Sequence, residues 1–175
     1  MVVEILLTQG KVALVDDEDK DLLNAETNWF ANRMGSKTSL NWYVTRHSLS
    51  INGKRGSVRL HRLILERILG RSLGANEQVD HINHNGLDNR RSNLRLASNQ
   101  ENCHNQRLRN VPKSSKFKGV SWHKHRQKWQ ANINFNGRKE YLGIFHNEED
   151  AALAYDSAAK ELFGRFCCLN FPDES

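Results

Sequence analysis

Apolar and polar residues alternate in the first third of the chain, a pattern typical of β-strands. The run VEILLTQGKVALV, residues 3–15, alternates on both sides of a turn at Gln9-Gly10-Lys11 and predicts a β-hairpin. A second β pattern extends over residues 42–60, with a turn at Asn52-Gly53. Together these patterns predict a β-rich N-terminal region.

Helical spacing of apolar residues appears in two places. Residues 61–69 carry leucine and isoleucine at helical intervals, and Gly70 ends the pattern. Residues 148–163 place alanine, tyrosine and leucine on one face, and the small alanines would let this helix lie close to a sheet. That sheet is predicted to be antiparallel, with an apolar face and a polar face. Its three strands are expected near residues 120–123, 129–135 and 139–142.

The most informative segment of the chain is QVDHINHNGLDNRRSNLRLASNQENCHNQ. Residues 78–81 and 94–97 predict two short strands on either side of a polar, glycine-containing loop. Ser98 with Glu101 three residues later has the pattern of a capping box, which starts a helix that continues toward Arg107. The predicted order is strand, loop, strand, helix.

The composition favours a polyanionic partner. The 175 residues carry 26 Lys+Arg against 20 Asp+Glu, a formal net charge of +6, which raises the expectation of such a partner. The three cysteines form no CxxC pair, which favours free thiols over a disulfide framework or a thiolate zinc site. No run approaches the roughly 20 apolar residues of a membrane span, and no secretory signal pattern is present, so no membrane partner is expected.

Charge is unevenly distributed near the C-terminus. Residues 117–141 hold six basic side chains against Glu140 alone, whereas residues 142–175 hold two basic and seven acidic side chains. This separation would turn the predicted sheet, and not the helix, toward DNA. Upstream, the apolar pattern stops over residues 107–116, where Pro, Ser, Lys and Arg gather and predict a basic linker.

Four polar side chains could meet around one divalent cation: Asp80, His81, Asn93 and Asn102. A carboxylate and an amide oxygen are ligands for Mg²⁺, or for Mn²⁺, with water and phosphate oxygens completing the shell. An imidazole beside the cation can accept a proton from water near neutral pH. Asp80 and His81 can both serve only if the strand ends or bulges there. The arginines expected to hold flanking phosphates are Arg90, Arg91 and Arg95.

This segment resembles the HNH endonuclease family, which has a ββα-metal fold. Asp80-His81 matches the opening pair, Asn93 the central asparagine, and Asn102 the closing position, which is asparagine in a variant common among phage and intron homing endonucleases. The resemblance implies that His81 is the general base and that Asp80 and Asn102 are metal ligands. It implies that Asn93 orients the loop or His81. The alternative is that these Asp and Asn residues only cap turns.

Two further patterns favour plain structural roles. The acidic residues 16–21 are expected to remain solvated at a helix N-terminus and not to form a metal cluster. Trp122 and Trp129 fall on the apolar phase of their strands, so we expect both in the core. For residues 1–77, support of the nuclease strands and additional DNA contact both remain open.

Residues 117–172 resemble the APETALA2-type DNA-binding domain of plant ethylene-response factors. The matching pieces are FKGVSWHKHRQKWQANI, YLGIF, EEDAALAYDSAAKELFG and LNFP. In that family the sheet enters the major groove of DNA. Several base-reading Arg and Glu positions are Ser, Asn or Lys in this chain, so the preferred DNA sequence does not transfer. The implied contact positions are Lys118, Ser121, Arg126, Asn132, Asn134, Lys139 and Tyr141.

The sequence therefore predicts a modular homing-type DNA endonuclease. Residues 1–106 would form an N-terminal α+β region and an HNH nuclease with its core at 78–106, residues 107–116 a linker, and residues 117–172 the APETALA2-type domain. The enzyme would act in the cytoplasm of a bacterial or phage-infected cell, as a monomer that nicks DNA or a dimer that cuts both strands. The alternative is a non-catalytic DNA-binding regulator that retains the HNH scaffold. An RNA-associated role is disfavoured because no exposed aromatic platform is expected.

Overall fold

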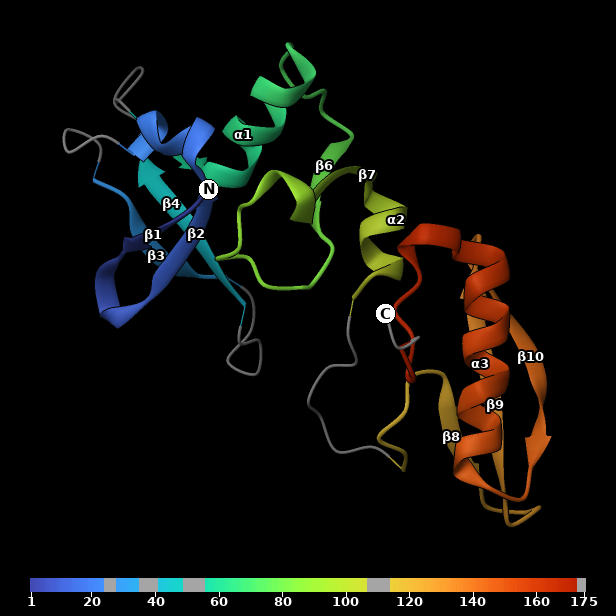
Figure 1. Cartoon of the computed structure of the whole chain (residues 1–175). Coiled ribbons are helices and arrows are strands. Elements are labelled where there is room, and N and C mark those ends of the chain that lie inside the picture. The colour runs from blue at the N-terminus through green and yellow to red at the C-terminus, as the bar shows by residue number, and fades with distance from the viewer. Residues whose placement is uncertain (24–27, 35–40, 49–55, 107–113, 173–175) are drawn as a thin grey trace. The chain divides into compact units, whose positions relative to one another are not determined.

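The computed structural model describes residues 1–23, 28–34, 41–48, 56–106 and 114–172 (Figure 1). The chain forms two compact units, Met1–Asn102 and Cys103–Ser175. Each unit combines antiparallel strands with helices, so the α+β class predicted from the sequence is confirmed.

The first unit begins with the predicted hairpin. Strands β1 (Val2–Leu6) and β2 (Val12–Asp16) pair in antiparallel register, which confirms the prediction. The turn residues Gln9 and Gly10 have φ angles of 60° and 64°, a left-handed conformation that glycine adopts without strain. A short 3₁₀ helix, η2 (Asp17–Leu23), follows the hairpin.

A second sheet and the first α-helix complete the N-terminal region. Strands β3 (Phe30–Arg33), β4 (Trp42–His47) and β5 (Ser57–Arg59) pair antiparallel in the order β3-β4-β5. Helix α1 (Leu60–Leu69) begins directly after β5, so the β pattern predicted over 42–60 stops one residue early. The turn expected at Asn52-Gly53 lies outside the described residues.

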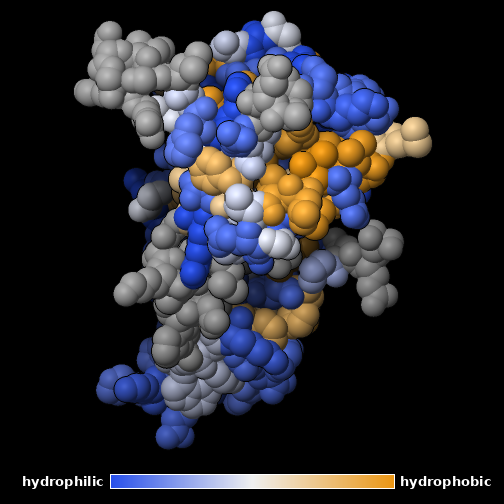
Figure 2. All heavy atoms as spheres, turned by 90° about the vertical axis from the view of Figure 1, so that its left-hand side faces the viewer, coloured by the Kyte–Doolittle hydropathy of each residue, from blue (hydrophilic) through white to orange (hydrophobic). Residues whose placement is uncertain are grey.

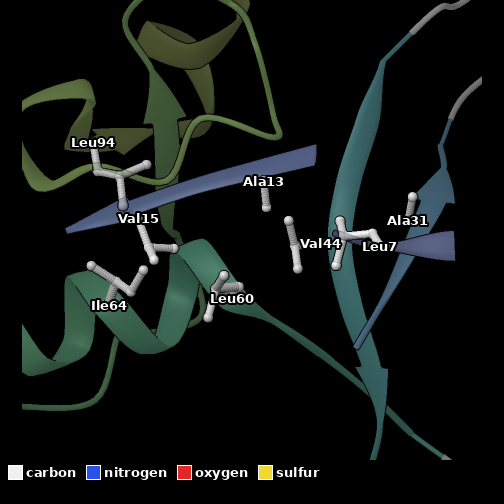
Figure 3. Close-up of a cluster of buried hydrophobic side chains, with 8 residues drawn as sticks. All are labelled: Leu7, Ala13, Val15, Ala31, Val44, Leu60, Ile64 and Leu94. Carbon is white, nitrogen blue, oxygen red and sulfur yellow. The ribbon is translucent and has the colours of Figure 1, made fainter. Parts of the chain in front are cut away.

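One hydrophobic core joins the N-terminal region to the HNH segment (Figure 3). Leu94, from the second strand of that segment, packs with Val15 of β2 and Ile64 of α1. Burying one such side chain stabilises the fold by about 1.5–3 kcal/mol. Strand β2 and helix α1 therefore support the second strand of the HNH segment. The complete set of buried residues is Leu7, Ala13, Val15, Ala31, Val44, Leu60, Ile64 and Leu94.

The HNH segment has the predicted order of strand, loop, strand and helix. Strands β6 (Glu77–His81) and β7 (Leu94–Ser98) pair antiparallel, a short 3₁₀ helix η3 (Arg91–Asn93) precedes β7, and helix α2 (Asn99–His104) follows it. The capping box is confirmed: the Ser98 amide donates to Glu101 Oε2 (2.7 Å), and the Glu101 amide donates to Ser98 Oγ (3.2 Å). The helix ends at His104 instead of continuing toward Arg107.

The second unit is a three-stranded antiparallel sheet covered by one helix. Its strands are β8 (Val120–His123), β9 (Lys128–Phe135) and β10 (Arg138–Phe145), in the order β10-β9-β8. Helix α3 (Glu148–Phe163) packs on the sheet, and the 3₁₀ turn η4 (Gly164–Phe166) follows. Of the predicted linker 107–116, residues 107–113 lie outside the described part of the chain.

Small residues bring α3 close to the sheet, as the sequence predicted. Ala151, Ala152 and Ala159 of α3 are fully buried. Gly119, at φ +80°, packs so tightly that an added Cβ would collide with the Tyr155 ring. The core position expected for Trp122 is wrong, because this side chain is 39% exposed beside Trp129 at the edge strand β8. Among the described helices, none has the length and apolar character needed to cross a membrane.

Candidate functional site

Two predicted site residues lie at the end of β6. Asp80 lies opposite Arg95 and His81 opposite Leu94 in the β6–β7 pair, and both side chains are buried. β6 ends at His81, where the His84 amide donates to the His81 carbonyl at 2.9 Å and begins a turn. The chain turns directly after His81, but Asp80 and His81 both lie within the regular β6–β7 register, so their side chains leave opposite faces of the strand.

The Asp80 carboxylate is held by an arginine. Its Oδ2 accepts hydrogen bonds from Nε of Arg95 at 2.7 Å and from Nη2 of Arg95 at 2.6 Å. The sequence predicted that Arg95 contacts a phosphate, but in the structure its guanidinium lies beside the predicted metal ligand. Charge-assisted bonds of this kind fix the orientation of a carboxylate.

The His81 imidazole is surrounded by an amide and two rings. Nε2 of His81 lies 3.4 Å from Oδ1 of Asn89, and the rings of His61 and Tyr43 lie 5.0 and 5.9 Å away between centroids. Burial lowers the pKa of His81, against opposing effects of Asn89 and two nearby carboxylates. Burial and the neighbouring His81 hold the pKa of His61 well below its usual value. Both imidazoles are therefore mainly neutral at pH 7, as a general base requires.

Asn93 closes the loop between the two strands. Its Nδ2 donates to the Asp88 carbonyl at 2.7 Å and to Oδ1 of Asn83 at 3.0 Å. Its Oδ1 accepts from the Asn83 amide at 3.0 Å. These contacts all lie within the loop, so they hold the chain that leads from His81 to β7.

Asn102 is oriented by a glutamine of β6. Nδ2 of Asn102 donates to Oε1 of Gln78 at 2.6 Å, and Nε2 of Gln78 donates to Oδ1 of Asn99 at 3.1 Å. Because Nδ2 of Asn102 is bonded to Gln78, the other end of the amide, Oδ1, points away from Gln78. Because Gln78 and Asp80 are two residues apart on β6, they share a face of the strand, and Asn102 lies on the same side.

The other two arginines predicted at phosphates also bind carboxylates. Nε and Nη2 of Arg90 donate to the two oxygens of Asp88 at 2.8 and 2.7 Å. Nε and Nη2 of Arg91 donate to the two oxygens of Asp19 at 2.7 and 3.0 Å, and the Arg91 amide donates to Asp16 at 2.7 Å. A phosphate contact at either arginine would have to compete with these bidentate pairs.

The acidic run is partly buried, in contrast to the solvated face predicted from the sequence. The Asp19 side chain is fully buried and also accepts a bond from Arg67 at 3.3 Å. Next to it, the amide of Leu14 donates to the Leu87 carbonyl, and the Asn89 amide donates to the Leu14 carbonyl. Arg67 and Arg91, both distant in sequence, compensate the buried charge of Asp19. Together these contacts hold the HNH loop against β2 and η2.

The strand register of the second unit gathers predicted DNA-contacting residues on one sheet face. Ser121 lies opposite Gln130, Asn132 opposite Tyr141, and Asn134 opposite Lys139. Residues directly opposite each other share a face, and alternate residues of β9 do so as well. We call this set of six side chains the polar sheet face. The intervening residues Ala131 and Ile133 are buried against α3.

Exposure differs among the predicted contact residues. Ser121, Arg126, Asn134, Lys139 and Tyr141 are exposed, whereas Asn132 is 9% exposed and accepts a bond from Gln130 at 3.1 Å. Arg126 lies in the turn between β8 and β9.

Lys118 has a different environment from the polar sheet face. Its Nζ donates to the carbonyls of His104 and Gln106 at 2.7 and 2.8 Å, and burial lowers its pKa. Two of the three N–H donors of the ammonium group are therefore in use, which leaves one for a DNA phosphate.

Three side chains at the candidate site have partners that the sequence did not predict: Gln78, Asn89 and His61. Their role depends on hydrogen bonds and ring contacts between strands and loops, which residue spacing does not reveal. Nδ1 of His61 is buried without a hydrogen-bond partner among the described residues.

The donor chemistry of the site fits a hard cation. Over the described ranges, no group of three or more His, Cys, Asp or Glu side chains could hold a metal ion. Asp80 and Asn102 instead offer two oxygen donors, and Mg²⁺ is usually bound by one or two protein oxygens with water and phosphate oxygens.

Comparisons with known proteins divide the chain in the same way as its motifs. Residues 58–104 match the family model for the HNH endonuclease, and residues 115–165 match that for the AP2 domain. An uncharacterized HNH endonuclease of Acanthamoeba polyphaga mimivirus is 35% identical over 129 residues, which cover 74% of this chain and 66% of the viral protein.

Two further relatives each match one part of the chain. Protein 3.8 of Escherichia phage T7 is 36% identical over 90 residues, covering 50% of this chain and 71% of the phage protein. The ethylene-responsive transcription factor WRI1 of Arabidopsis thaliana is 42% identical over 59 residues, covering 33% of this chain and 14% of the plant protein. From its two family matches and these relatives, the chain contains an HNH endonuclease domain at residues 58–104 and an AP2 domain at residues 115–165.

Proposed function

We propose that the protein is a homing-type, metal-dependent DNA endonuclease that hydrolyses a phosphodiester bond of double-stranded DNA. The observation that carries the proposal is the Asn102–Gln78 hydrogen bond, which supports a position for Asn102 on the Asp80 side of β6, beside the strand end at His81. A carboxylate, an amide oxygen and a neutral imidazole then lie on neighbouring elements. These are the groups that metal-assisted hydrolysis of a phosphodiester requires.

In this proposal His81 acts as the general base. Its neutral imidazole takes a proton from a water molecule, which attacks the phosphorus atom. Asp80 and Asn102 would hold Mg²⁺, or Mn²⁺, through their oxygens, and the ion would supply charge neutralisation at the phosphate and at the leaving oxygen. Asn93 keeps the loop closed behind His81.

The polar sheet face of the AP2 domain would select the DNA site. Its exposed amide, hydroxyl and ammonium groups can bond both base edges and phosphates. Arg126 would add a phosphate contact from the adjacent turn. Because the described part of the chain offers one candidate site, a monomer would nick one strand, and a dimer would be needed to cut both. The reaction would take place in the cytoplasm of a bacterial or phage-infected cell.

The alternative is a DNA-binding regulator in which the HNH unit is only a scaffold. The Asp80–Arg95 pair favours it, because that pair competes with metal binding. An RNA-binding role is less favoured: the exposed aromatic residues Trp122 and Tyr141 lie on opposite faces of the sheet by register, and so form no common stacking platform.

The test is incubation of the purified chain with supercoiled plasmid DNA in Mg²⁺ or Mn²⁺, followed by sequencing of the cut ends. We expect relaxed or linear DNA with ends at a defined sequence, and intact plasmid in EDTA. His81→Ala serves as the matched control for a contaminating nuclease. Duplex binding without cleavage in either metal would reject the nuclease and favour the regulator.

A further inference from the structure

Asn89 lies beside the proposed general base. Its side-chain nitrogen, its side-chain oxygen and its backbone N–H each have a polar partner. Its side chain is fully buried. Its amide nitrogen Nδ2 donates to the Leu87 carbonyl at 3.1 Å, and its backbone N–H donates to the Leu14 carbonyl at 2.8 Å. The remaining side-chain atom, Oδ1, faces Nε2 of His81 at 3.4 Å. The orientation of the Asn89 amide is therefore set by the Leu87 carbonyl, which can only accept.

The orientation of this amide decides the tautomer of its neighbour. An amide oxygen has no proton to donate, so the His81–Asn89 contact is a hydrogen bond only when Nε2 of His81 carries the proton. In a neutral imidazole the other nitrogen, Nδ1, then holds the lone pair that accepts a proton. A distance of 3.4 Å is long for a hydrogen bond, but catalytic hydrogen bonds often shorten when substrate binds.

The surroundings keep Asn89 and His81 facing each other. The amide of Leu14 bonds the Leu87 carbonyl at 2.9 Å, so β2 holds the loop on both sides of Asn89. The rings of His61 and Tyr43 contact the imidazole of His81. Asn93, in contrast, uses its amide within the loop.

We infer that Asn89 is a positioning residue that holds His81 in the Nε2-protonated tautomer, with Nδ1 as the nitrogen that accepts the proton from water. The catalytic part of this inference rests on the proposed nuclease function. The tautomer itself is a property of the chain without DNA or metal, and can be measured separately.

The first measurement is the His81 tautomer in the full-length, ¹⁵N-labelled chain, free of metal, at mildly alkaline pH. Long-range ¹H–¹⁵N spectra distinguish the two neutral tautomers, and His81→Gln identifies the signal of His81. We expect the Nε2-protonated form. A predominantly Nδ1-protonated His81 in the unmodified chain overturns the inference without the need for any variant of Asn89.

Two substitutions separate positioning from a general structural role. Asn89→Leu and Asn89→Asp both remove the donor to the Leu87 carbonyl, but only aspartate keeps an oxygen facing His81. We expect the leucine variant to lose the single tautomer and to cut DNA about 10- to 100-fold more slowly in kcat, with little change in KM. The aspartate variant should keep the Nε2-protonated form and most of the rate. Thermal unfolding of both variants checks that the fold is retained.

The outcomes distinguish this inference from the proposed function. An unchanged tautomer in a folded Asn89→Leu variant, or equal loss of rate in both variants, contradicts positioning by Asn89. If the leucine variant does not fold, the tautomers of the unmodified chain and of Asn89→Asp decide the question. An Nε2-protonated His81 in a chain that cuts no DNA rejects the nuclease proposal and leaves the tautomer assignment intact.

Discussion

The cationic side chains of the HNH loop and those of the AP2 sheet have opposite surroundings. Arg90, Arg91 and Arg95 each form close contacts with one or more carboxylates of the first unit. Arg126 and Lys139 of the second unit are exposed, and neither has an ion-pair partner among the described residues. Similar charges in one chain thus serve different purposes.

This difference suggests how the two units divide their work. In the HNH segment, Arg91 compensates the buried carboxylate of Asp19, and Arg95 orients the carboxylate of Asp80. These arginines therefore stabilise the fold of the first unit. On the AP2 sheet, charge faces solvent, where it can meet phosphates without losing a partner. A count of basic residues alone therefore overstates the DNA-contacting surface of the first unit. The following substitutions test this contrast, from the largest expected effect to the smallest.

The largest expected effect is that of His81→Ala, which should separate DNA cleavage from DNA binding. Removing the proposed general base should lower the cleavage rate by about 10²- to 10⁴-fold, because proton transfer from water would be lost. Duplex binding should change little, since the polar sheet face is untouched. Plasmid cleavage and gel-shift titrations measure the two effects. Cleavage at the unmodified rate would remove His81 from the mechanism.

Arg91→Met tests whether the loop arginines are structural. It leaves the fully buried Asp19 without its bidentate partner, and we expect a loss of about 3 kcal/mol in unfolding free energy, near the lower limit for such pairs because Arg67 remains. Lys139→Met is the matched control and should change stability by less than about 0.5 kcal/mol. Denaturant unfolding measures both. Equal effects would erase the contrast between the two units.

Lys139→Ala and Arg126→Ala test the exposed cations as phosphate contacts. Each should weaken duplex binding similarly for different DNA sequences and reduce the slope of log K against log salt by about 0.9. Fluorescence anisotropy at several salt concentrations measures the slope. A slope that is unchanged in both variants would place the DNA elsewhere on the protein.

The smallest effect concerns Glu77, the first residue of β6. Its ion pair with Arg71 and its bond from the Gly74 amide lower the pKa of Glu77 to about 2. Because the pKa is depressed, the stabilisation is present above the ordinary pKa near 4.5 and is lost as the pH falls through 2. Glu77→Gln should therefore lower the thermal midpoint slightly at pH 7, and this difference should disappear once the pH lies below 2.

Local features of the fold were accessible from the sequence. The Ser98–Glu101 capping box, the hairpin turn at Gln9-Gly10 and the alternation along β9 each depend on residues close together in the chain. Trp122 was misplaced because alternation shows which face a residue takes but not whether the core extends to the edge strand.

The polar contacts of the candidate site could not be predicted from the sequence in the same way. Spacing indicated Asp80, His81 and Asn102 as a group, but not the partners that orient them. Arg95 lies across a strand pair from Asp80, and Asp19 meets Arg91 from 72 positions away, so a sequence pattern cannot reveal either pair. Asn89 is one of several asparagines in its loop, and only the direction of its amide distinguishes it.

The contact between Asp19 and Arg91 also imposes an order on folding during synthesis. A ribosome adds about 5–20 residues per second. Arg91 is therefore synthesised roughly 4–14 seconds after Asp19, which lies 72 positions earlier in the chain. During that delay the Asp19 carboxylate lacks its bidentate partner, and the β1–β2 hairpin lacks the HNH loop that packs on it. The nuclease unit can therefore close only after its last strand has left the ribosome, when the AP2 domain is still being translated.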